Sequence, residues 1–296
     1  MTPEQILAFA PKVLTQEQRE AYFEDGYLLL EKFIDDAWLD RISEVTDQFI
    51  EKSRPMTKSS ASFDLEDGHS ADAPRLRRLT HPVEQHETYR ELAFTKLADL
   101  AEDLVGPDIK FHHSKLNFKW SHGGEEVKWH QDIQFWPHTN YSPVTIGVYL
   151  SDVDDEMGPM GVIPGSHQRE LFDLYGRDGA WTGAIDEADL ARVKLDEAVW
   201  LRGSRGSVTV HNCRMVHGSM PNLSPRPRPL LLQTYASADA LHCTNIVDSA
   251  PRSNTVIRGR PAKWIHFDPR PCLNPPDWSK GYTSIFAVQQ GEDAAD

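Results

Sequence analysis

After residue 106 the chain is a series of short apolar segments separated by glycine, proline and polar turns. Segments of about four to eight residues rich in Val, Ile, Thr and aromatic side chains, bounded by such turns, are typical of β-strands. We expect strands at residues 109–120, 127–135, 144–150, 162–163, 206–211, 215–218 and 230–236. Many short strands with tight turns predict a mainly β fold with flanking helices, a double-stranded β-helix (jelly roll, cupin-like).

The first part of the chain predicts helices. Thr15 followed by Gln18 forms a capping box at the start of one helix. A second helix begins at Asp35 or Asp36, because apolar side chains then recur every three or four positions. A third helix is expected over residues 87–105, before a Gly-Pro pair.

The length of 296 residues fits one large domain of this kind. We predict a single domain over residues 1–296. It would comprise a helical front (1–106), a jelly-roll core (about 107–238) and a C-terminal extension (239–296).

A histidine and an aspartate, His130 and Asp132, stand two positions apart in the second predicted strand. Alternate strand side chains leave on the same face. With a later histidine, His217, they complete two imidazoles and one carboxylate, the ligand set that suits non-haem Fe(II) and leaves coordination positions open. Open positions on a redox metal indicate chemistry with O2. An H-x-D pair is common by chance, so this interpretation depends on other motifs.

An arginine follows the second histidine at a useful distance. An iron oxygenase of this type needs a two-electron co-substrate, and 2-oxoglutarate supplies it. The far carboxylate of 2-oxoglutarate needs a fixed cation, and the planar fork of arginine binds a carboxylate through two parallel hydrogen bonds. Arg228, which begins a predicted strand, is well placed for this role. Arg226 faces the same side and remains an alternative.

Four motifs occur in an order that resembles the phytanoyl-CoA dioxygenase family of Fe(II)/2-oxoglutarate-dependent oxygenases. They are W-H-Q-D at 129–132, G-P-M-G-V-I-P-G-S-H at 158–167, H-G-S-M-P-N-x-S at 217–224 and the trailing arginine. The segments at 14–27 and 104–108 resemble the family's N-terminal helix, its first strand and the turn before its core strands. The resemblance covers roughly residues 14–238.

The resemblance implies roles for individual residues. The implied iron ligands are His130, Asp132 and His217. The implied 2-oxoglutarate-binding residues are Arg228, Ser219 and Lys119. Related halogenases have a small residue in place of the ligand aspartate, so Asp132 favours hydroxylation or desaturation. Many members have a tryptophan where this chain has Gly147, which we expect to open space beside the co-substrate.

Substrate contacts are predicted from two short segments. Phe135 and Trp136 follow the ligand strand and could form a wall of the substrate pocket, or simply core. Arg75, Arg77 and Arg78 follow a polar segment and could bind a carboxylate or phosphate, or be a solvated basic run. That polar segment, residues 53–74, and the insertion at 168–205 are expected to be loops that close over the site.

Other histidines could suggest a second metal site. We interpret each of them as unligated: His112, His113, His122, His211 and His242.

Composition limits the partners and the compartment. With 31 basic and 45 acidic residues the formal charge is −14, which opposes non-specific binding to DNA and to anionic membranes. No apolar run approaches the roughly 20 residues of a membrane span. Residues 1–13 lack the features of a secretory leader, and the three cysteines cannot all pair. We therefore expect a reduced, cytoplasmic setting and a small-molecule substrate, with the oligomeric state left open.

Together these patterns predict a dioxygenase that uses Fe(II), 2-oxoglutarate and O2. It would hydroxylate an unactivated C–H bond of a small-molecule or acyl metabolite and release succinate and CO2. The alternative is a jelly-roll module that binds metal or 2-oxoglutarate without O2 chemistry, or a redox-silent metalloenzyme. Whether the substrate is a free acid or a CoA thioester is also left open.

Overall fold

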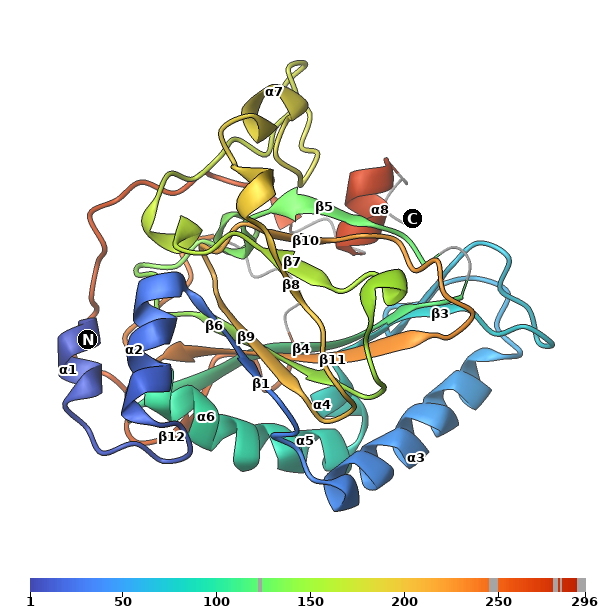
Figure 1. The fold of residues 1–296 in the computed structure, drawn as a ribbon, viewed down its shortest axis with the longest axis horizontal. Helices are drawn as coiled ribbons and strands as arrows, with labels where there is room; N and C mark the ends of the chain where they lie inside the picture. Colours follow the sequence, from blue (N-terminus) through green and yellow to red (C-terminus); the bar gives the residue numbers. More distant parts are fainter. Residues whose placement is uncertain (122–123, 245–249, 279–281, 283, 292–296) are drawn as a thin grey trace.

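The structure is a computed structural model that describes residues 1–121, 124–244, 250–278, 282 and 284–291. Two antiparallel sheets form its centre (Figure 1). The larger sheet contains β1 (Tyr27–Leu30), β2 (Phe63–Leu65), β3 (Leu76–Thr80), β4 (Ile109–Lys119), β6 (Val144–Tyr149), β9 (Val208–Asn212), β11 (Arg228–Ser237) and β12 (Thr255–Arg258). The smaller sheet contains β5 (Val127–His130), β7 (Met160–Val162), β8 (Val199–Leu201) and β10 (His217–Ser219).

The order of the strands is that of a jelly roll. In the larger sheet the order is β1-β9-β6-β11-β4-β3-β2, with β12 beside β4, and in the smaller sheet it is β5-β10-β7-β8. Strands distant in the chain are therefore neighbours in each sheet, as in a double-stranded β-helix. The predicted fold class, mainly β with flanking helices, is confirmed.

Helices cover the outer face of the larger sheet (Figure 1). On that side lie α1 (Pro3–Leu7), α2 (Gln16–Asp25), α3 (Asp36–Ser53), α4 (Pro82–Gln85), α5 (Glu87–Phe94) and α6 (Lys96–Val105). Two short helices, α7 (Glu187–Leu190) and α8 (Ile285–Gln290), lie on the side of the smaller sheet instead. The capping box of α2 is present, since the Thr15 side chain accepts a hydrogen bond from the Gln18 backbone and the Gln18 side chain accepts one from Thr15. The prediction of one helix over 87–105 is wrong, because the backbone leaves helical geometry at Thr95 (φ −119°, ψ −93°).

The two faces of the larger sheet have different chemistry. On β9, Val208 and Val210 belong to the hydrophobic cluster beneath the helices. The alternate residues, Thr209 and His211, are buried and polar. Successive side chains along a strand point to opposite faces of the sheet. Since the helices cover the apolar face, the polar face points toward the smaller sheet. The site described below lies between the sheets.

The segment predicted as a polar loop, residues 53–74, contains a short strand. β2 lies within it and pairs with β3. The pairing is reinforced by an ion pair between Arg77 and Asp64, with Nε and Oδ2 3.0 Å apart and both side chains buried. The loop prediction is therefore wrong at β2, because this edge strand depends on a partner that local sequence does not reveal.

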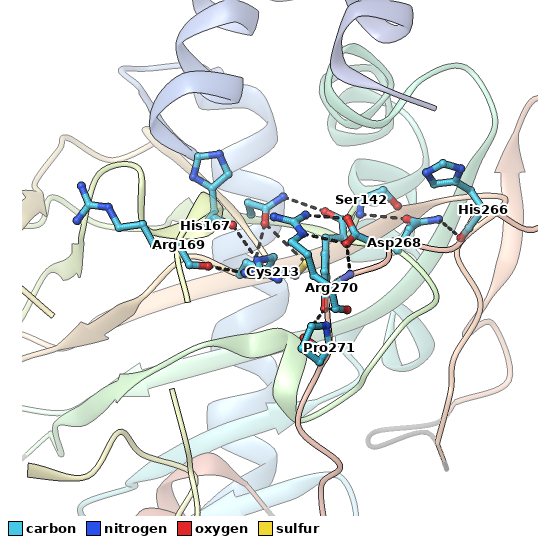
Figure 2. Close-up of polar contacts among 12 residues, drawn as sticks. Ser142, His167, Arg169, Cys213, His266, Asp268, Arg270 and Pro271 are labelled. Atoms are coloured by element: carbon cyan, nitrogen blue, oxygen red, sulfur yellow. Dashed lines mark hydrogen bonds and ion pairs between the residues drawn. The ribbon is translucent and has the colours of Figure 1, made fainter. Parts of the chain in front are cut away.

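The C-terminal extension lies against the jelly roll through backbone carbonyls (Figure 2). Asn140 donates a hydrogen bond to the carbonyl of His266 (3.2 Å), and the Tyr141 hydroxyl donates to the carbonyl of Arg270 (3.0 Å). Arg270 in turn pairs with Asp268 (2.8 Å). These contacts attach residues 266–271 to the loop that precedes β6.

Among the described helices, none combines the length and the apolar character that a bilayer span requires.

Candidate metal centre

Three predicted ligands converge between the sheets. The side chains of His130, Asp132 and His217 are buried, and one ligand atom from each lies within 4.8 Å of the other two. Asp132 Oδ1 is 3.7 Å from His130 Nε2 and 3.9 Å from His217 Nε2. The two imidazole rings are 4.1 Å apart between centroids. This compact set of two imidazoles and a carboxylate could hold a divalent ion.

Strand pairing brings the two histidines together. His130 is the last residue of β5, and His217 is the first residue of β10, its direct antiparallel partner. Asp132 was predicted on the same strand as His130, but the strand ends at His130. Asp132 instead opens a 3-10 turn, η1 (Asp132–Gln134). The prediction of a strand over 127–135 is wrong in this part, and the turn, rather than strand alternation, directs the carboxylate toward the histidines.

Backbone carbonyls orient both histidines. His130 Nδ1 is 2.8 Å from the carbonyl oxygen of Lys128, and His217 Nδ1 is 2.9 Å from that of Met215. In each case the carbonyl belongs to the residue two positions earlier and accepts the Nδ1 proton. The Nε2 lone pair is then free for a metal, an arrangement typical of metal-bound histidine.

The carboxylate has further polar neighbours. Thr145 Oγ1 lies 3.4 Å from Asp132 Oδ2, and His211 Nε2 lies 3.4 Å from the same oxygen. Burial alone would raise the pKa of the Asp132 carboxyl, but the surrounding imidazoles outweigh burial and hold the pKa well below its usual range. Burial and the neighbouring imidazoles lower the pKa of His217 well below its usual value. The set therefore consists of an anionic carboxylate and neutral imidazole, the states that bind metal.

His211 was interpreted from the sequence as unligated. It lies beside the ligand set, with its ring 4.4 Å from that of His217. A signal was present: His211 precedes His217 by six residues in a segment predicted as the neighbouring strand. Local sequence did not reveal which face it occupies.

Arg228 lies at the opposite wall of the cavity that contains the ligand set. Its guanidinium is buried, and neither Nε nor Nη1 has a hydrogen-bond partner among the described residues. Burial lowers the pKa of Arg228. An unpaired buried cation is costly, so this group calls for an anionic ligand. Arg226, the alternative, is about half exposed and forms an ion pair with Asp154 (2.5 Å).

Lys119 and Ser219 lie close to Arg228 in different ways. Lys119 is directly opposite Arg228 across β4 and β11, and its Nζ donates to the carbonyls of Ser219 (3.2 Å) and Met220. Burial and the charge of Arg228 lower the pKa of Lys119 well below its usual range. Ser219 lines the cavity. Lys119 does not line it and instead holds the segment after His217 through two backbone carbonyls.

The cavity wall includes residues that the sequence reasoning missed. Lys115 and Asn117 lie on β4 at alternate positions, in phase with Lys119, and both line the cavity. The sequence could have indicated them, because polar residues recur at every second position along this predicted strand. Gly147 was expected to open space, and this expectation is wrong. A Cβ there would lie 2.6 Å from Thr209 Oγ1 and 3.1 Å from a methyl carbon of Leu230, so neighbouring side chains already fill the position.

Phe135 and Trp136, predicted to form a substrate wall, belong to a buried hydrophobic cluster. The Phe135 ring meets the His130 ring edge-on at 5.9 Å. The Trp136 ring lies 4.9 Å from that of His112. Neither residue lines the cavity, so the packing supports the alternative interpretation of both as core.

The basic run after residue 74 divides between surface and interior. Arg75 pairs with Glu66 (2.5 Å) at the edge of β3. Arg78 is fully buried: its Nε donates to Asn117 Oδ1 (2.9 Å), and its two terminal nitrogens have no hydrogen-bond partner within the described ranges. The Arg78 guanidinium also lies 5.8 Å from the ring centre of Phe286. Arg78 therefore stands directly behind two cavity residues.

The C-terminal helix closes one side of the cavity, which the sequence reasoning did not anticipate. Ile285 and Phe286 of α8 line the cavity. Gln289 fixes the helix by accepting a hydrogen bond from the Lys128 backbone (2.8 Å) and donating one to the carbonyl of Gly183 (2.8 Å). Because α8 is short and lies far from the ligand motifs in the sequence, no local pattern connected it to the site.

Comparison with known proteins agrees with this architecture. Residues 22–230 match the phytanoyl-CoA dioxygenase family. The chain is 33% identical over 242 residues to a probable alpha-ketoglutarate-dependent hypophosphite dioxygenase from Stutzerimonas stutzeri, which covers 78% of this chain and 83% of that protein. It is 29% identical over 233 residues to an L-proline trans-4-hydroxylase from Streptomyces griseoviridis, covering 72% of this chain and 83% of that protein.

A solved structure shares the fold. The crystal structure of EctD from S. alaskensis with 2-oxoglutarate and 5-hydroxyectoine superposes with a TM-score of 0.64 at 23% identity, covering 84% of this chain and 86% of that chain. The resemblance predicted from the motifs is confirmed by the match over residues 22–230. The chain belongs to the phytanoyl-CoA dioxygenase family.

Proposed function

We propose that this protein is an Fe(II)- and 2-oxoglutarate-dependent dioxygenase that hydroxylates a small-molecule substrate. The observation that carries the proposal is a single cavity that presents a two-histidine, one-carboxylate set on one wall and an unpaired buried arginine on another. The first suits iron with open positions, and the second suits the far carboxylate of 2-oxoglutarate. A redox-silent metalloenzyme would have no use for the second feature.

Each residue has a defined task in this proposal. His130, Asp132 and His217 would hold Fe(II), and Arg228 would bind the far carboxylate of 2-oxoglutarate. Ser219 lies on the cavity wall near Arg228 and would add a hydrogen bond, while Lys119 positions the Ser219 segment through its carbonyls.

When bound, iron and 2-oxoglutarate would supply the oxidising power for oxygen insertion from O2 into a C–H bond, with release of succinate and CO2. The chain's own contribution is orientation and exclusion of water. Carbonyls hold the Nε2 atoms of His130 and His217 toward the ion, and Thr145 holds the carboxylate. Apolar side chains from β11 and α8 form much of the remaining wall, which keeps the site dry.

For the substrate we propose a compact molecule that carries a negative group. Lys115 and Asn117 line the cavity, and the unpaired end of Arg78 lies behind Asn117 and Phe286. With a chain charge of −14, a local cationic wall is what an anionic substrate requires. The names of two relatives, a hypophosphite dioxygenase and an L-proline hydroxylase, also point to small molecules with an acidic group.

A CoA thioester is the competing substrate class. Ile285 and Phe286 of α8 are buried and occupy part of the cavity wall, which leaves little room for a long acyl chain. Of the three arginines that could bind the phosphates of CoA, Arg75 and Arg77 pair with Glu66 and Asp64, and Arg78 is fully buried. We therefore favour a free small anion.

The test is an aerobic assay of the Fe(II)-loaded protein with 2-oxoglutarate and a panel of hypophosphite, small amino acids, small carboxylates and an acyl-CoA. We expect succinate formation that a small anion stimulates, with a product 16 mass units heavier than the substrate. Succinate formation only with the acyl-CoA would overturn the substrate class. A protein that binds 2-oxoglutarate and iron but forms no succinate with any compound of the panel would favour the alternative of a binding module without O2 chemistry.

Arg78 allows the substrate class to be tested separately. Arg78→Met removes the charge and keeps much of the side-chain volume, whereas Arg78→Lys keeps the charge. We expect Arg78→Met to raise KM for an anionic substrate about tenfold, equivalent to about 1.4 kcal/mol, with KM for 2-oxoglutarate unchanged. Arg78→Lys should recover part of the loss. Equal KM values for both variants and the wild type would remove Arg78 from the substrate site.

We further propose that residues 1–296 work as one oxygenase domain in the cytoplasm. The three cysteines Cys213, Cys243 and Cys272 are free thiols in this structure, which suits a reducing compartment. Fractionation of the native host would test the location.

A further inference from the structure

A second group of histidines is buried beside the jelly-roll core. The ring nitrogens of His112, His138 and His242 come within 4.8 Å of one another. The ring centroids lie 5.1 Å apart for His112 and His138, 4.6 Å for His112 and His242, and 4.1 Å for His138 and His242. The ligand pair His130 and His217, at 4.1 Å, has the same spacing.

The fold constructs this group from three separate segments. On β4, His113 lies opposite Thr234 and Phe111 lies opposite Tyr235, so His112 is an extra residue in a β-bulge. A bulge re-aims its side chain, and here the His112 ring packs against the ring of His113. His138 and His242 face each other directly across a two-stranded backbone bridge.

One of the three histidines is oriented in the same way as His130 and His217. His138 Nδ1 is 2.7 Å from the carbonyl oxygen of Trp136, two residues earlier, as in His130 and His217. His112 Nδ1 contacts His113 Nδ1. The Nε2 atoms of His112 and His138 are buried and have no hydrogen-bond partner in the part of the chain that the structure describes. A buried nitrogen without a hydrogen-bond partner is rare in native proteins, and a metal ion bound to its lone pair would account for it.

The group is neutral and accessible from the surface. Burial lowers the pKa of His112 and His138 well below the usual value and that of His242 to about 4. One surface cleft is lined by His138 and Cys243, and another by His242 and Asn254, so an ion has a route to either side. The nearby Lys110 ammonium donates to the carbonyl of Ala240.

We propose that His112, His138 and His242 form a second metal site for a borderline divalent transition ion of the zinc class. Neutral imidazole is a preferred ligand for such ions, and three histidines with one open position form a common tetrahedral site. The site would join three parts of the chain: β4, the loop that follows Asp132, and the C-terminal extension. Its role is to fix that extension on the core. The proposal uses none of the catalytic ligands and does not depend on the proposed function.

The experiment uses the full chain with His130→Ala and His217→Ala, which disables the catalytic centre. We titrate this double variant with Co²⁺ and record its visible absorption, then displace Co²⁺ with Zn²⁺. About one equivalent of Co²⁺ should bind with the spectrum of a histidine-ligated, low-coordinate ion. Adding His242→Ala should abolish the signal. Adding His266→Ala, a change at an exposed histidine outside the group, should leave it intact.

Circular dichroism checks that each variant is folded. If His242→Ala fails to fold, His138→Gln provides the same test at a second ligand. Zn²⁺ should also raise the melting temperature of the double variant and leave that of the ligand-deleted variant unchanged. A folded double variant that binds no Co²⁺, or binding that survives both His242→Ala and His138→Gln, would overturn the proposal.

Discussion

The molecule contains two histidine clusters with similar spacing and different chemistry. The catalytic cluster pairs two imidazoles with Asp132, and it opens into the cavity that holds Arg228. The second cluster has three imidazoles and no carboxylate, and it packs against Trp136. In both, a carbonyl two residues earlier orients a histidine.

The difference lies in charge and access. A carboxylate would neutralise part of an ion's charge, and the ligand set lines a cavity that also contains Arg228. The second cluster offers neutral donors within a packed wall, which suits an ion that is held rather than one that reacts. The same local geometry can therefore serve catalysis or structure, and the surroundings decide which. Four predictions test this comparison.

The largest effect is expected for Asp132→Ala, which makes the catalytic cluster resemble the second one. Losing the carboxylate should abolish hydroxylation, either because iron dissociates or because the oriented site is lost. Iron stoichiometry and product formation measure the two outcomes. Asp154→Ala, at a half-exposed carboxylate paired with Arg226, is the matched control. A variant that hydroxylates at the wild-type rate would mean that Asp132 is not a ligand.

Arg228→Ala removes the buried cation proposed to bind the carboxylate of 2-oxoglutarate, a group that the second cluster does not have. A lost charge-assisted bidentate contact costs about 2–5 kcal/mol, so KM for 2-oxoglutarate should rise about 30-fold or more while iron stays bound. Steady-state kinetics at saturating Fe(II) measure this effect. Arg226→Ala should change KM little, since that guanidinium lies at the surface. The reverse result would assign the co-substrate to Arg226.

Phe286→Ala tests whether access distinguishes the clusters. Removing the ring should admit water, raising the ratio of succinate to hydroxylated product about threefold to tenfold, equivalent to about 0.7–1.4 kcal/mol. Both products are quantified in the same reaction. Phe267→Ala, at an exposed phenylalanine, is the control. An unchanged ratio would show that α8 does not seal the site.

The smallest effect concerns the metal-free protein. The pKa of His242 is about 4 in the folded chain and 6.5 as the ordinary value. The unfolded chain therefore binds the proton first, and the stability contributed by neutral His242 is complete above pH 6.5 and declines as the pH falls toward 4. Denaturant melts in chelator at several pH values measure this. His242→Gln should flatten the decline, and an identical slope in both proteins would contradict the buried, neutral state.

The candidate ligands could be predicted from the sequence because histidine and aspartate side chains occur at a metal-binding spacing within predicted strands. His130, Asp132 and His217 were predicted from residue type, spacing and motif order. The strand pattern predicted the jelly roll, since alternation and turn residues are local properties. Arg228 was predicted as a candidate, with Arg226 left open, because both positions share one strand face.

Tertiary structure decided which of these candidates meet. Arg228 is buried whereas Arg226 is half exposed, and the 3-10 turn after His130 directs Asp132. Helix α8 lines the cavity although it begins 57 residues after Arg228 (285 − 228). The second cluster depends on a bulge at His112 and on a bridge between two distant loops. Chain periodicity carries no information about long-range pairing or bulges. The sequence therefore predicted the candidate ligands and the fold class, and packing decided which side chains lie together.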